Sequence, residues 1–476
     1  MIARGSVSYY LPVVLCLSLA LTACGGGSNS GGSTPSATDA WTWISGSSTT
    51  PGGAEGPPGV YGTEGTPSTS NTPGGRWFSA GWSDSSGNLW LFGGAGSDSN
   101  GAFGFLSDLW EFSPANKTWT WVSGSSTVNA PASYGSVGVP STSNTPGGRY
   151  GSVGWSDNSG NLGLFGGAGS FDLNGTYGFL GDLWEFNPAN KTWTWVSGSS
   201  TVNASGSYGT PGVFSTSNTP GARGNSLNWR DSSGNFWLFG GYCTIGNSPF
   251  CSMNDLWEFN PANKTWTWVS GSSTANVSGS YGTLGVPSIS NTPGSRADSV
   301  TWMDGKGNFW LFGGSGLDSN GTLGFLGDLW EFNPANKTWT WVGGSSTGNV
   351  SGSYGTQGVP STSNTPGSRI GSAGWTDSSG NLWLFGGRSE MNNPLNDLWE
   401  FNPANQTWTW VSGSGTVSAP GNYGILDAPS TSNMPGARES SVSWTDSGSN
   451  FWLFGGGGYD SAGTYGYLND LWFYHP

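Results

Sequence analysis

The sequence contains very little histidine, cysteine or charge. Its 476 residues include one histidine, His475, and four cysteines, and charged residues make up 9% of the chain. A Ser-His-Asp triad needs a histidine inside the fold, and a multi-histidine metal site needs several, so a single histidine near the C-terminus argues against both. We therefore predict no catalytic residues, no metal ligands and no cofactor, and an enzyme is the less favoured interpretation.

Basic residues are also scarce. Lys and Arg number 14 against 28 Asp and Glu, which gives a net charge of −14. Nucleic-acid binding needs a basic stripe that displaces counterions, and this chain has none. Of the acidic residues, 17 occupy three positions of an internal repeat described below. The negative charge therefore belongs mainly to the architecture.

Long apolar runs are absent beyond the first residues. Arg4 precedes an apolar stretch from Leu11 to Ala23, which is too short for a stable membrane span. The stretch ends in Leu21-Thr22-Ala23-Cys24, which resembles a bacterial lipoprotein signal with Cys24 as the lipid-accepting residue. The alternative is an ordinary signal peptide cut nearby.

The lipoprotein interpretation makes residues 1–24 a signal peptide and residues 25–40 a flexible Gly/Ser/Thr linker. Acyl chains on Cys24 would anchor the exported protein to a membrane. Because Gly25 is not an aspartate, nothing resembles an inner-membrane retention signal. We expect the protein at the outer membrane or cell surface.

Two cysteines remain after export, Cys243 and Cys251, in one loop. Their spacing allows a small disulfide-closed ring. A two-cysteine metal site is the alternative, but no histidine or third cysteine lies near them in the sequence.

Glycine is abundant, with 84 residues, and aromatic residues make up 14% of the chain. Most of them belong to six copies of one motif series: P-G-x-R, Trp, D-x-x-G-N, L-F-G-G, D-L-W-E-F, N-P-A-N-K-T and W-T-W-V. The P-G-x-R arginines are Arg76, Arg149, Arg223, Arg296, Arg369 and Arg438. The dense turn residues and short apolar runs favour an all-β fold.

Each copy predicts four short antiparallel strands. The second copy shows them at residues 150–155, 162–165, 183–186 and 193–196, with a tight turn at 157–161 and another at 187–192. We expect the second strand to end at Gly166-Gly167. The spacing from the arginine to the second glycine of G-G is 18 residues in every copy.

These landmarks resemble the kelch repeat over residues 41–476. The resemblance implies a six-bladed β-propeller of four-stranded antiparallel blades. Kelch units are about 50 residues long, whereas these are 69–74, and the excess lies between W-T-W-V and P-G-x-R. We predict that this segment is an ordered loop packed on the blade. The resemblance also places it on the same face as the connection between the second and third strands, where a binding surface would lie.

The first W-T-W, at Trp41, has no preceding repeat, and the last copy stops just before its own W-T-W. We therefore predict that the strand from Trp41 to Ile44 completes the last blade and protects both sheet edges.

Most tryptophans and all six arginines have structural interpretations. Of 30 tryptophans, 29 occupy five repeated positions and are expected in the core, while Trp77 lies outside the pattern. The arginines are expected to pair with the D-L-W aspartates, with an anion-binding ring as the alternative. Three D-x-N-G loops, at Asp98, Asp172 and Asp318, are interpreted as turns and not as calcium sites.

Residues that break the repeat carry the candidate site. They are Trp77, Phe78, Tyr150, Asp298, Arg388, Glu390 and Glu439. We expect several of them near the central opening, where Asp298, Glu439 and Arg388 together would form a polar sugar site or a proton-shuttling pair.

The sequence thus predicts a monomeric, surface-anchored recognition module for a glycan or an extracellular protein. One alternative resembles the sialic-acid mutarotase type, a cofactor-free kelch enzyme, in which Asp298 and Glu439 would act as acid and base. A galactose-oxidase type of copper enzyme needs histidine ligands that this chain lacks. A passive structural surface protein is the third alternative.

Overall fold

The computed structural model describes residues 39–51, 55–170, 176–245 and 248–476. The chain divides into two units, Met1–Ser36 and Ala37–Pro476, and all described residues belong to the second. The predicted signal peptide, the lipid-accepting Cys24 and the linker up to residue 38 lie outside the described residues. Within the described ranges, no helix is long and apolar enough to cross a membrane.

The described residues form antiparallel β-sheets, and the first copy illustrates the plan. Its strands are β2 (Arg76–Trp77), β3 (Ala80–Ser83), β4 (Leu89–Ser97), β5 (Phe103–Ser113) and β6 (Thr118–Ser123). They pair in the order β2-β4-β5-β6, and β3 also pairs with β4. The innermost of the four predicted strands is therefore divided in two.

The second and third copies vary this plan. The second has two sheets. One contains β7 (Arg149–Tyr150), β10 (Ala168–Ser170) and β11 (Tyr177–Phe179). The other contains β8 (Val153–Ser156), β9 (Leu162–Phe165), β12 (Gly181–Asn187) and β13 (Thr192–Ser199). The third has β14 (Leu227–Arg230), β15 (Phe236–Ile245), β16 (Ser248–Asn260) and β17 (Thr265–Ser270).

The remaining copies follow the first. The fourth contains β18 (Arg296–Ala297), β19 (Val300–Met303), β20 (Phe309–Leu317), β21 (Leu323–Asn333) and β22 (Thr338–Gly343). The fifth contains β23 (Arg369–Ile370), β24 (Ala373–Thr376), β25 (Leu382–Ser389), β26 (Pro394–Asn402) and β27 (Thr407–Ser412). The sixth contains β28 (Arg438–Glu439), β29 (Val442–Thr445), β30 (Phe451–Tyr459) and β31 (Tyr465–His475).

The paired glycines do not end the second strand in most copies. In the first copy, β4 continues through Gly93 and Gly94, whose φ angles are 62° and 98°, and the pairing with β5 shifts between Phe92 and Gly94. A bulge of left-handed glycines lets a strand bend and carry on. The expected strand end holds only for the second copy, where β9 stops at Phe165.

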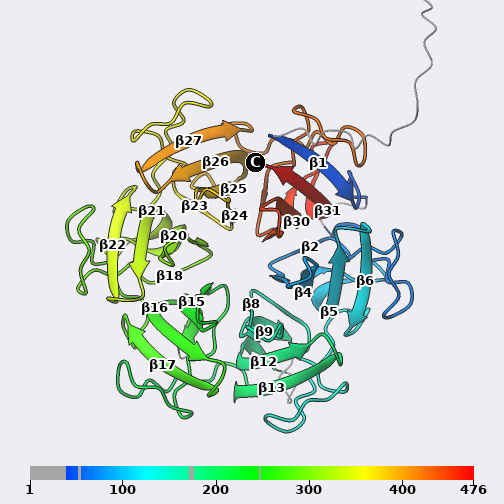
Figure 1. The fold of residues 1–476 in the computed structure, drawn as a ribbon, viewed down its shortest axis with the longest axis horizontal. Helices are drawn as coiled ribbons and strands as arrows, with labels where there is room; N and C mark the ends of the chain where they lie inside the picture. Colours follow the sequence, from blue (N-terminus) through cyan, green and yellow to red (C-terminus); the bar gives the residue numbers. More distant parts are fainter. Residues whose placement is uncertain (1–38, 52–54, 171–175, 246–247) are drawn as a thin grey trace, which may run out of the picture. The chain divides into compact units, whose positions relative to one another are not determined.

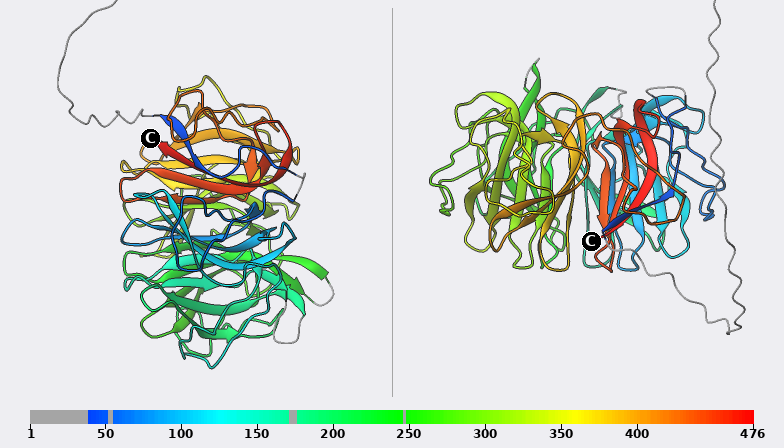
Figure 2. Two further views of the ribbon diagram at one scale, coloured as in Figure 1. Left: turned by 90° about the vertical axis from the view of Figure 1, so that its right-hand side faces the viewer. Right: turned by 90° about the horizontal axis from the view of Figure 1, so that it is seen from above.

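The N-terminal strand completes the last sheet, as the sequence predicts. β1 (Ala40–Ser45) pairs antiparallel with β31, and Trp41 lies opposite Tyr474. The blue strand β1 lies beside the red strand β31 in Figure 1, and the same neighbourhood is visible in Figure 2. The two ends of the repeat array thus share one sheet.

Neighbouring sheets pack face to face through aromatic and aliphatic side chains. The indole of Trp82 donates to the Gly163 carbonyl of the next copy at 2.8 Å, and Trp444 of the last copy donates to the Trp90 carbonyl of the first at 3.1 Å. One buried cluster joins Trp452 of the last copy to Phe112 of the first. The sheets are arranged about a common centre (Figure 1), which is consistent with a β-propeller.

The core prediction for the repeated tryptophans needs one correction. The D-L-W tryptophans and the first Trp of each W-T-W are buried, but the second Trp of each W-T-W is only half-buried. In the first copy this residue, Trp121, stands edge-on to Tyr61 of the long loop and donates its indole N–H to the Ser123 carbonyl. It packs against the core cluster from the outermost strand and lies opposite Trp110 of β5.

The long segment before each P-G-x-R is an ordered loop, as predicted. In the first copy, Ser68 forms a β-bridge with Trp119 of β6, and the Asn71 amide donates to the Trp119 carbonyl at 3.0 Å. Equivalent bridges occur at Ser141, Ser215, Ser288, Ser361 and Ser430. Each loop therefore covers the outermost strand of its own copy, where bare backbone groups would otherwise be exposed.

Each arginine pairs with the aspartate of its own copy, which confirms the structural interpretation. Arg76 Nη1 and Nη2 lie 2.8 Å from the two carboxylate oxygens of Asp108. The loop tyrosine Tyr61 and the indole of Trp110 donate to the same carboxylate, at 2.6 and 2.7 Å. The other ion pairs are Arg149–Asp182, Arg223–Asp255, Arg296–Asp328, Arg369–Asp397 and Arg438–Asp470.

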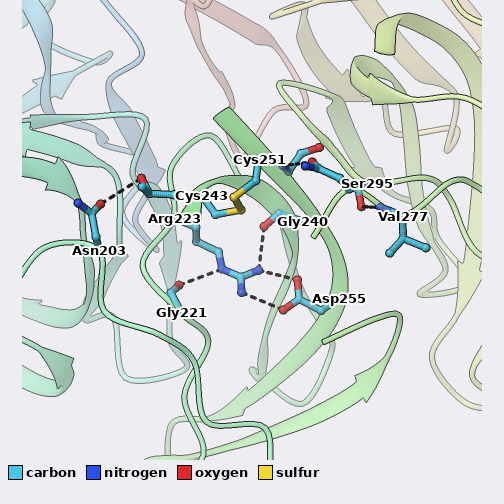
Figure 3. The surroundings of a disulfide bond; sticks show 12 residues. Asn203, Gly221, Arg223, Gly240, Cys243, Cys251, Asp255, Val277 and Ser295 are labelled. Carbon is cyan, nitrogen blue, oxygen red and sulfur yellow. Dashed lines mark hydrogen bonds and ion pairs between the residues drawn. A yellow bond between two sulfur atoms is a disulfide. The ribbon is translucent and has the colours of Figure 1, made fainter. Parts of the chain in front are cut away.

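These arginine side chains are at most 2% exposed, so they form no anion-binding ring. Burial raises the pKa of the Tyr61 hydroxyl, and the neighbouring Asp108 carboxylate raises it as well. The tyrosine therefore stays a hydrogen-bond donor. Figure 3 shows the network of the third copy, with Arg223 between Asp255 and the Gly240 and Gly221 carbonyls. The same figure shows Cys243 joined to Cys251 in a disulfide between β15 and β16.

Candidate functional site

A cavity of about 900 Å³ lies where the inner ends of the sheets meet. Its lining includes six of the seven predicted residues: Trp77, Phe78, Tyr150, Asp298, Arg388 and Glu439. Phe103 at the start of β5 and Gly321 in the connection between β20 and β21 also line it. The structure therefore brings most of the repeat-breaking residues together.

Glu390 is the exception. It directly follows the end of β25 at Ser389, and its carboxylate accepts a hydrogen bond from the Ser351 hydroxyl at 2.7 Å. Glu390 is not among the lining residues of this cavity.

A closed cycle of backbone hydrogen bonds positions the floor of the cavity. The residue two places after each arginine donates its amide to the carbonyl of the equivalent residue in the preceding copy, and the first copy's residue donates to the last copy's. The donor–acceptor pairs are Phe78–Ser440, Gly151–Phe78, Asn225–Gly151, Asp298–Asn225, Gly371–Asp298 and Ser440–Gly371, at 2.7–3.2 Å. One residue of every copy takes part, and the cycle has no open end.

The cycle explains why the inner strand of each copy is divided. All six members have positive φ, and the non-glycine members Phe78, Asn225, Asp298 and Ser440 have values of 52°, 54°, 60° and 55°. A left-handed backbone costs a non-glycine residue about 1–2 kcal/mol. Such strain is concentrated at functional sites. It occurs here at three of the residues that line the cavity, Phe78, Asn225 and Asp298.

We expect Gly151→Ala to weaken the cycle. The backbone strain alone costs about 1–2 kcal/mol, and the new Cβ would lie 1.9 Å from Asn225 Oδ1. The matched control is Gly160→Ala, because Gly160 also has positive φ but no atom near the position of its missing Cβ. Chemical denaturation would measure both variants, and equal losses would contradict a special role for the cycle.

One side of the cavity is aromatic. The ring centroid of Trp77 lies 4.8 Å from that of Phe78 and 5.2 Å from that of Tyr467. Phe105 stacks on Tyr150 with centroids 5.3 Å apart. The Trp77 indole nitrogen is buried and has no hydrogen-bond partner among the described residues.

Sequence reasoning missed several of these aromatic residues. Phe105, Phe179 and Tyr467 line the cavity from the strand that follows each second-to-third connection. The signal was a recurring Gly-Phe-Leu or Gly-Tyr-Leu, seen at residues 104–106, 178–180 and 466–468. Because the strands were expected to end at the paired glycines, the prediction places this Gly-aromatic-Leu pattern in a loop.

The opposite side of the cavity is polar, and Asp298 is its most unusual group. The Asn225 amide donates to the Asp298 carboxylate, and the Tyr242 hydroxyl interacts with it as well. Poor hydration in the cavity wall raises the pKa of Asp298, the two hydrogen bonds lower it, and the charge of Glu439 raises it. The net result is a pKa of about 6. At neutral pH the group is mainly ionised.

Arg388 and Glu439 form an ion pair in the same wall. Arg388 Nε lies 2.8 Å from both carboxylate oxygens of Glu439. Burial raises the pKa of Glu439, and the hydrogen bonds from Arg388 oppose that rise. The three predicted polar residues thus share the cavity, but Asp298 is bonded to neutral groups and not to Arg388.

A smaller cavity of about 240 Å³ continues below the cycle. Its wall carries one serine per copy, and each hydroxyl donates to the carbonyl of the first glycine of its own G-G pair. These serines are Ser79, Ser152, Ser226, Ser299, Ser372 and Ser441. These hydrogen bonds therefore hold the paired glycines in place from the wall of the smaller cavity.

The chemistry available in the large cavity is stacking, hydrogen bonding and electrostatic attraction. Across the described ranges, no three His, Cys, Asp or Glu side chains come together in a way that could hold a metal ion. No known family model matches the chain.

Proposed function

We propose that residues 41–476 form a six-bladed β-propeller whose central cavity binds a carbohydrate. Two observations support the blade count: the cycle of backbone hydrogen bonds takes one residue from each of six copies, and β1 completes the sheet of the sixth. Packing of the last copy on the first is the contact expected of a closed propeller.

The observation that carries the binding proposal is the two-sided lining of the cavity. Sugar rings have apolar C–H faces that stack on aromatic rings and hydroxyl groups that bond to carboxylates and amides. Trp77 and Phe78 offer the first surface, while Asp298 and Asn225 offer the second.

The size of the cavity favours a small ligand. Its volume of about 900 Å³ falls within the roughly 300–1,000 Å³ typical of small-molecule sites. A mutarotase-like enzyme would need two free acid–base groups at the site, but Glu439 is held in an ion pair by Arg388. Binding without chemistry is therefore the function that we propose, together with anchoring to the outer membrane or cell surface through Cys24.

Trp77→Ala should abolish most glycan binding without unfolding the protein. Loss of the apolar contact of one aromatic ring is worth about 1.5–3 kcal/mol, or about ten- to hundredfold in affinity. A glycan array would identify ligands for the parent protein, and calorimetry would then compare the variants.

Phe214→Ala is the matched control, because Phe214 is an exposed aromatic residue that does not line the cavity. It should bind like the parent. An array without hits, or a Trp77→Ala variant of unchanged affinity, would contradict the proposal.

A further inference from the structure

The large cavity contains more negative charge than its own side chains neutralise. Among the described residues that line it, the charged ones are Asp298, Arg388 and Glu439. Arg388 is paired with Glu439, so those two charges compensate each other. Asp298 is left with the neutral partners Asn225 and Tyr242. One carboxylate in the cavity wall is thus without a cationic partner.

We propose that the bound sugar carries a positively charged amine, as in a 2-amino-2-deoxyhexose, and that this amine docks on Asp298. The inference rests on the proposed carbohydrate binding and names the class of sugar. An ammonium group supplies the charge that Asp298 lacks, and a partly buried ion is stabilised most by an opposite charge at hydrogen-bonding distance.

The aromatic wall reinforces the preference for a cation. The faces of aromatic rings carry negative potential and attract ammonium groups within about 6 Å. Tyr150 belongs to that wall, and its hydroxyl is close enough to Asp298 for the carboxylate to help raise the pKa of the tyrosine. The Asp298 carboxylate and the ring of Tyr150 therefore line the same cavity within electrostatic range of each other.

The other charged or titratable groups around Asp298 do not supply a cation. Tyr242 faces it from β15, Tyr150 from β7, and Glu439 adds a second negative charge from β28. Arg388 on β25 directs its guanidinium to Glu439 and to the Tyr465 hydroxyl. The local potential at Asp298 is therefore negative, and a neutral or acidic sugar would leave it so.

The amine preference should depend on pH. The pKa of Asp298 is about 6 in the free site, so the carboxylate is charged at pH 7.5 and becomes mostly neutral as the pH falls to about 5. An ammonium ligand favours the charged form. Its affinity should therefore fall on acidification, while a neutral sugar that stacks on the aromatic wall should bind about equally at both values.

Calorimetry on the full chain with matched sugars tests the inference. The probes are D-glucosamine and D-galactosamine, each compared with its N-acetylated form and with the parent hexose. We expect at least one amine to bind about tenfold or more tightly than its acetylated form at pH 7.5, and we expect this ratio to shrink at pH 5. Asp298→Asn should remove the ratio, because asparagine keeps the side-chain shape and tolerates the left-handed backbone.

Glu390→Gln is the control, because it removes a carboxylate outside the lining of the cavity; it should leave the ratio unchanged. Equal affinity for amine and acetylated sugars, or a preference that survives Asp298→Asn, would overturn the inference. If sugars bind in a Trp77-dependent way without such a preference, the proposed carbohydrate binding stands and the amine inference fails. If no sugar binds, both fail.

Discussion

Asp328→Ala should lower the free energy of unfolding by roughly 3–5 kcal/mol, because it leaves a buried arginine without its partner. In the fourth copy, both carboxylate oxygens of Asp328 accept hydrogen bonds from Arg296 at 2.7 Å. The Tyr281 hydroxyl and the Trp330 indole donate to the same group. Arg296 and Asp328 are fully buried, so water cannot replace these bonds.

The sign of this effect agrees with the pKa of the aspartate. Arg296 holds the pKa of Asp328 below its usual range although burial acts in the opposite direction. A carboxylate with a lowered pKa adds stability at neutral pH, and that contribution disappears as the pH falls through the folded-state pKa. Chemical denaturation at pH 7 would measure the loss.

Lys264→Ala provides the control. Lys264 and Glu185 also form an ion pair, but both side chains are partly exposed, so removal should cost at most about 1 kcal/mol. If Asp328→Ala were no more harmful than Lys264→Ala, the buried network would not be the main support of each copy.

Replacing Trp41 and Trp43 together by glycine should destabilise the protein by about 3–5 kcal/mol or more. Trp41 is almost fully buried and contacts Phe385 of the fifth copy as well as Tyr474 of the sixth. Its strand also supplies the backbone partners of β31. The loss should therefore appear at both ends of the repeat array.

Hydrogen exchange distinguishes this outcome from local fraying. We expect amides of β30 and β31 to lose protection in the double variant, while amides in the third copy change less. Phe214→Ala is the control, since Phe214 is an exposed aromatic residue outside β1. Normal protection of β31 in the double variant would contradict closure by the N-terminal strand.

Strict repetition made much of the fold predictable. An arginine and a D-L-W aspartate recur in every copy, which predicted their pairing, and the unpaired W-T-W at Trp41 predicted the closing strand. The divided inner strand was not predictable, because the strain at Phe78 and Asp298 comes from hydrogen bonds between neighbouring copies whose residues lie far apart in the sequence. The role of Tyr61 was missed because its partner, Asp108, lies 47 residues away.

Departure from the repeat led to six of the residues that line the cavity. Trp77, Phe78 and Asp298 stand out because equivalent positions in other copies carry different side chains. Phe105 and Tyr467 follow a local pattern, so nothing distinguished them from structural residues until the strands were seen to pass the paired glycines. Glu390 also departs from the repeat, but it follows the end of β25, accepts a hydrogen bond from Ser351 and does not line the cavity.

The cycle of backbone hydrogen bonds joins the six copies through main-chain atoms, whereas the proposed ligand would be recognised by side chains. Its bonds use only main-chain atoms, so the side chain at each of its positions is free to differ among phenylalanine, glycine, asparagine, aspartate and serine. A change of ligand would need only single substitutions at these positions, with the surrounding sheets untouched. Tolerance of a left-handed backbone makes glycine, asparagine and aspartate the most accessible choices. Space beside the next member of the cycle is a second constraint, because a Cβ at Gly151 would lie 1.9 Å from Asn225 Oδ1. The centre of the molecule is thus a place where specificity can evolve at little cost to stability.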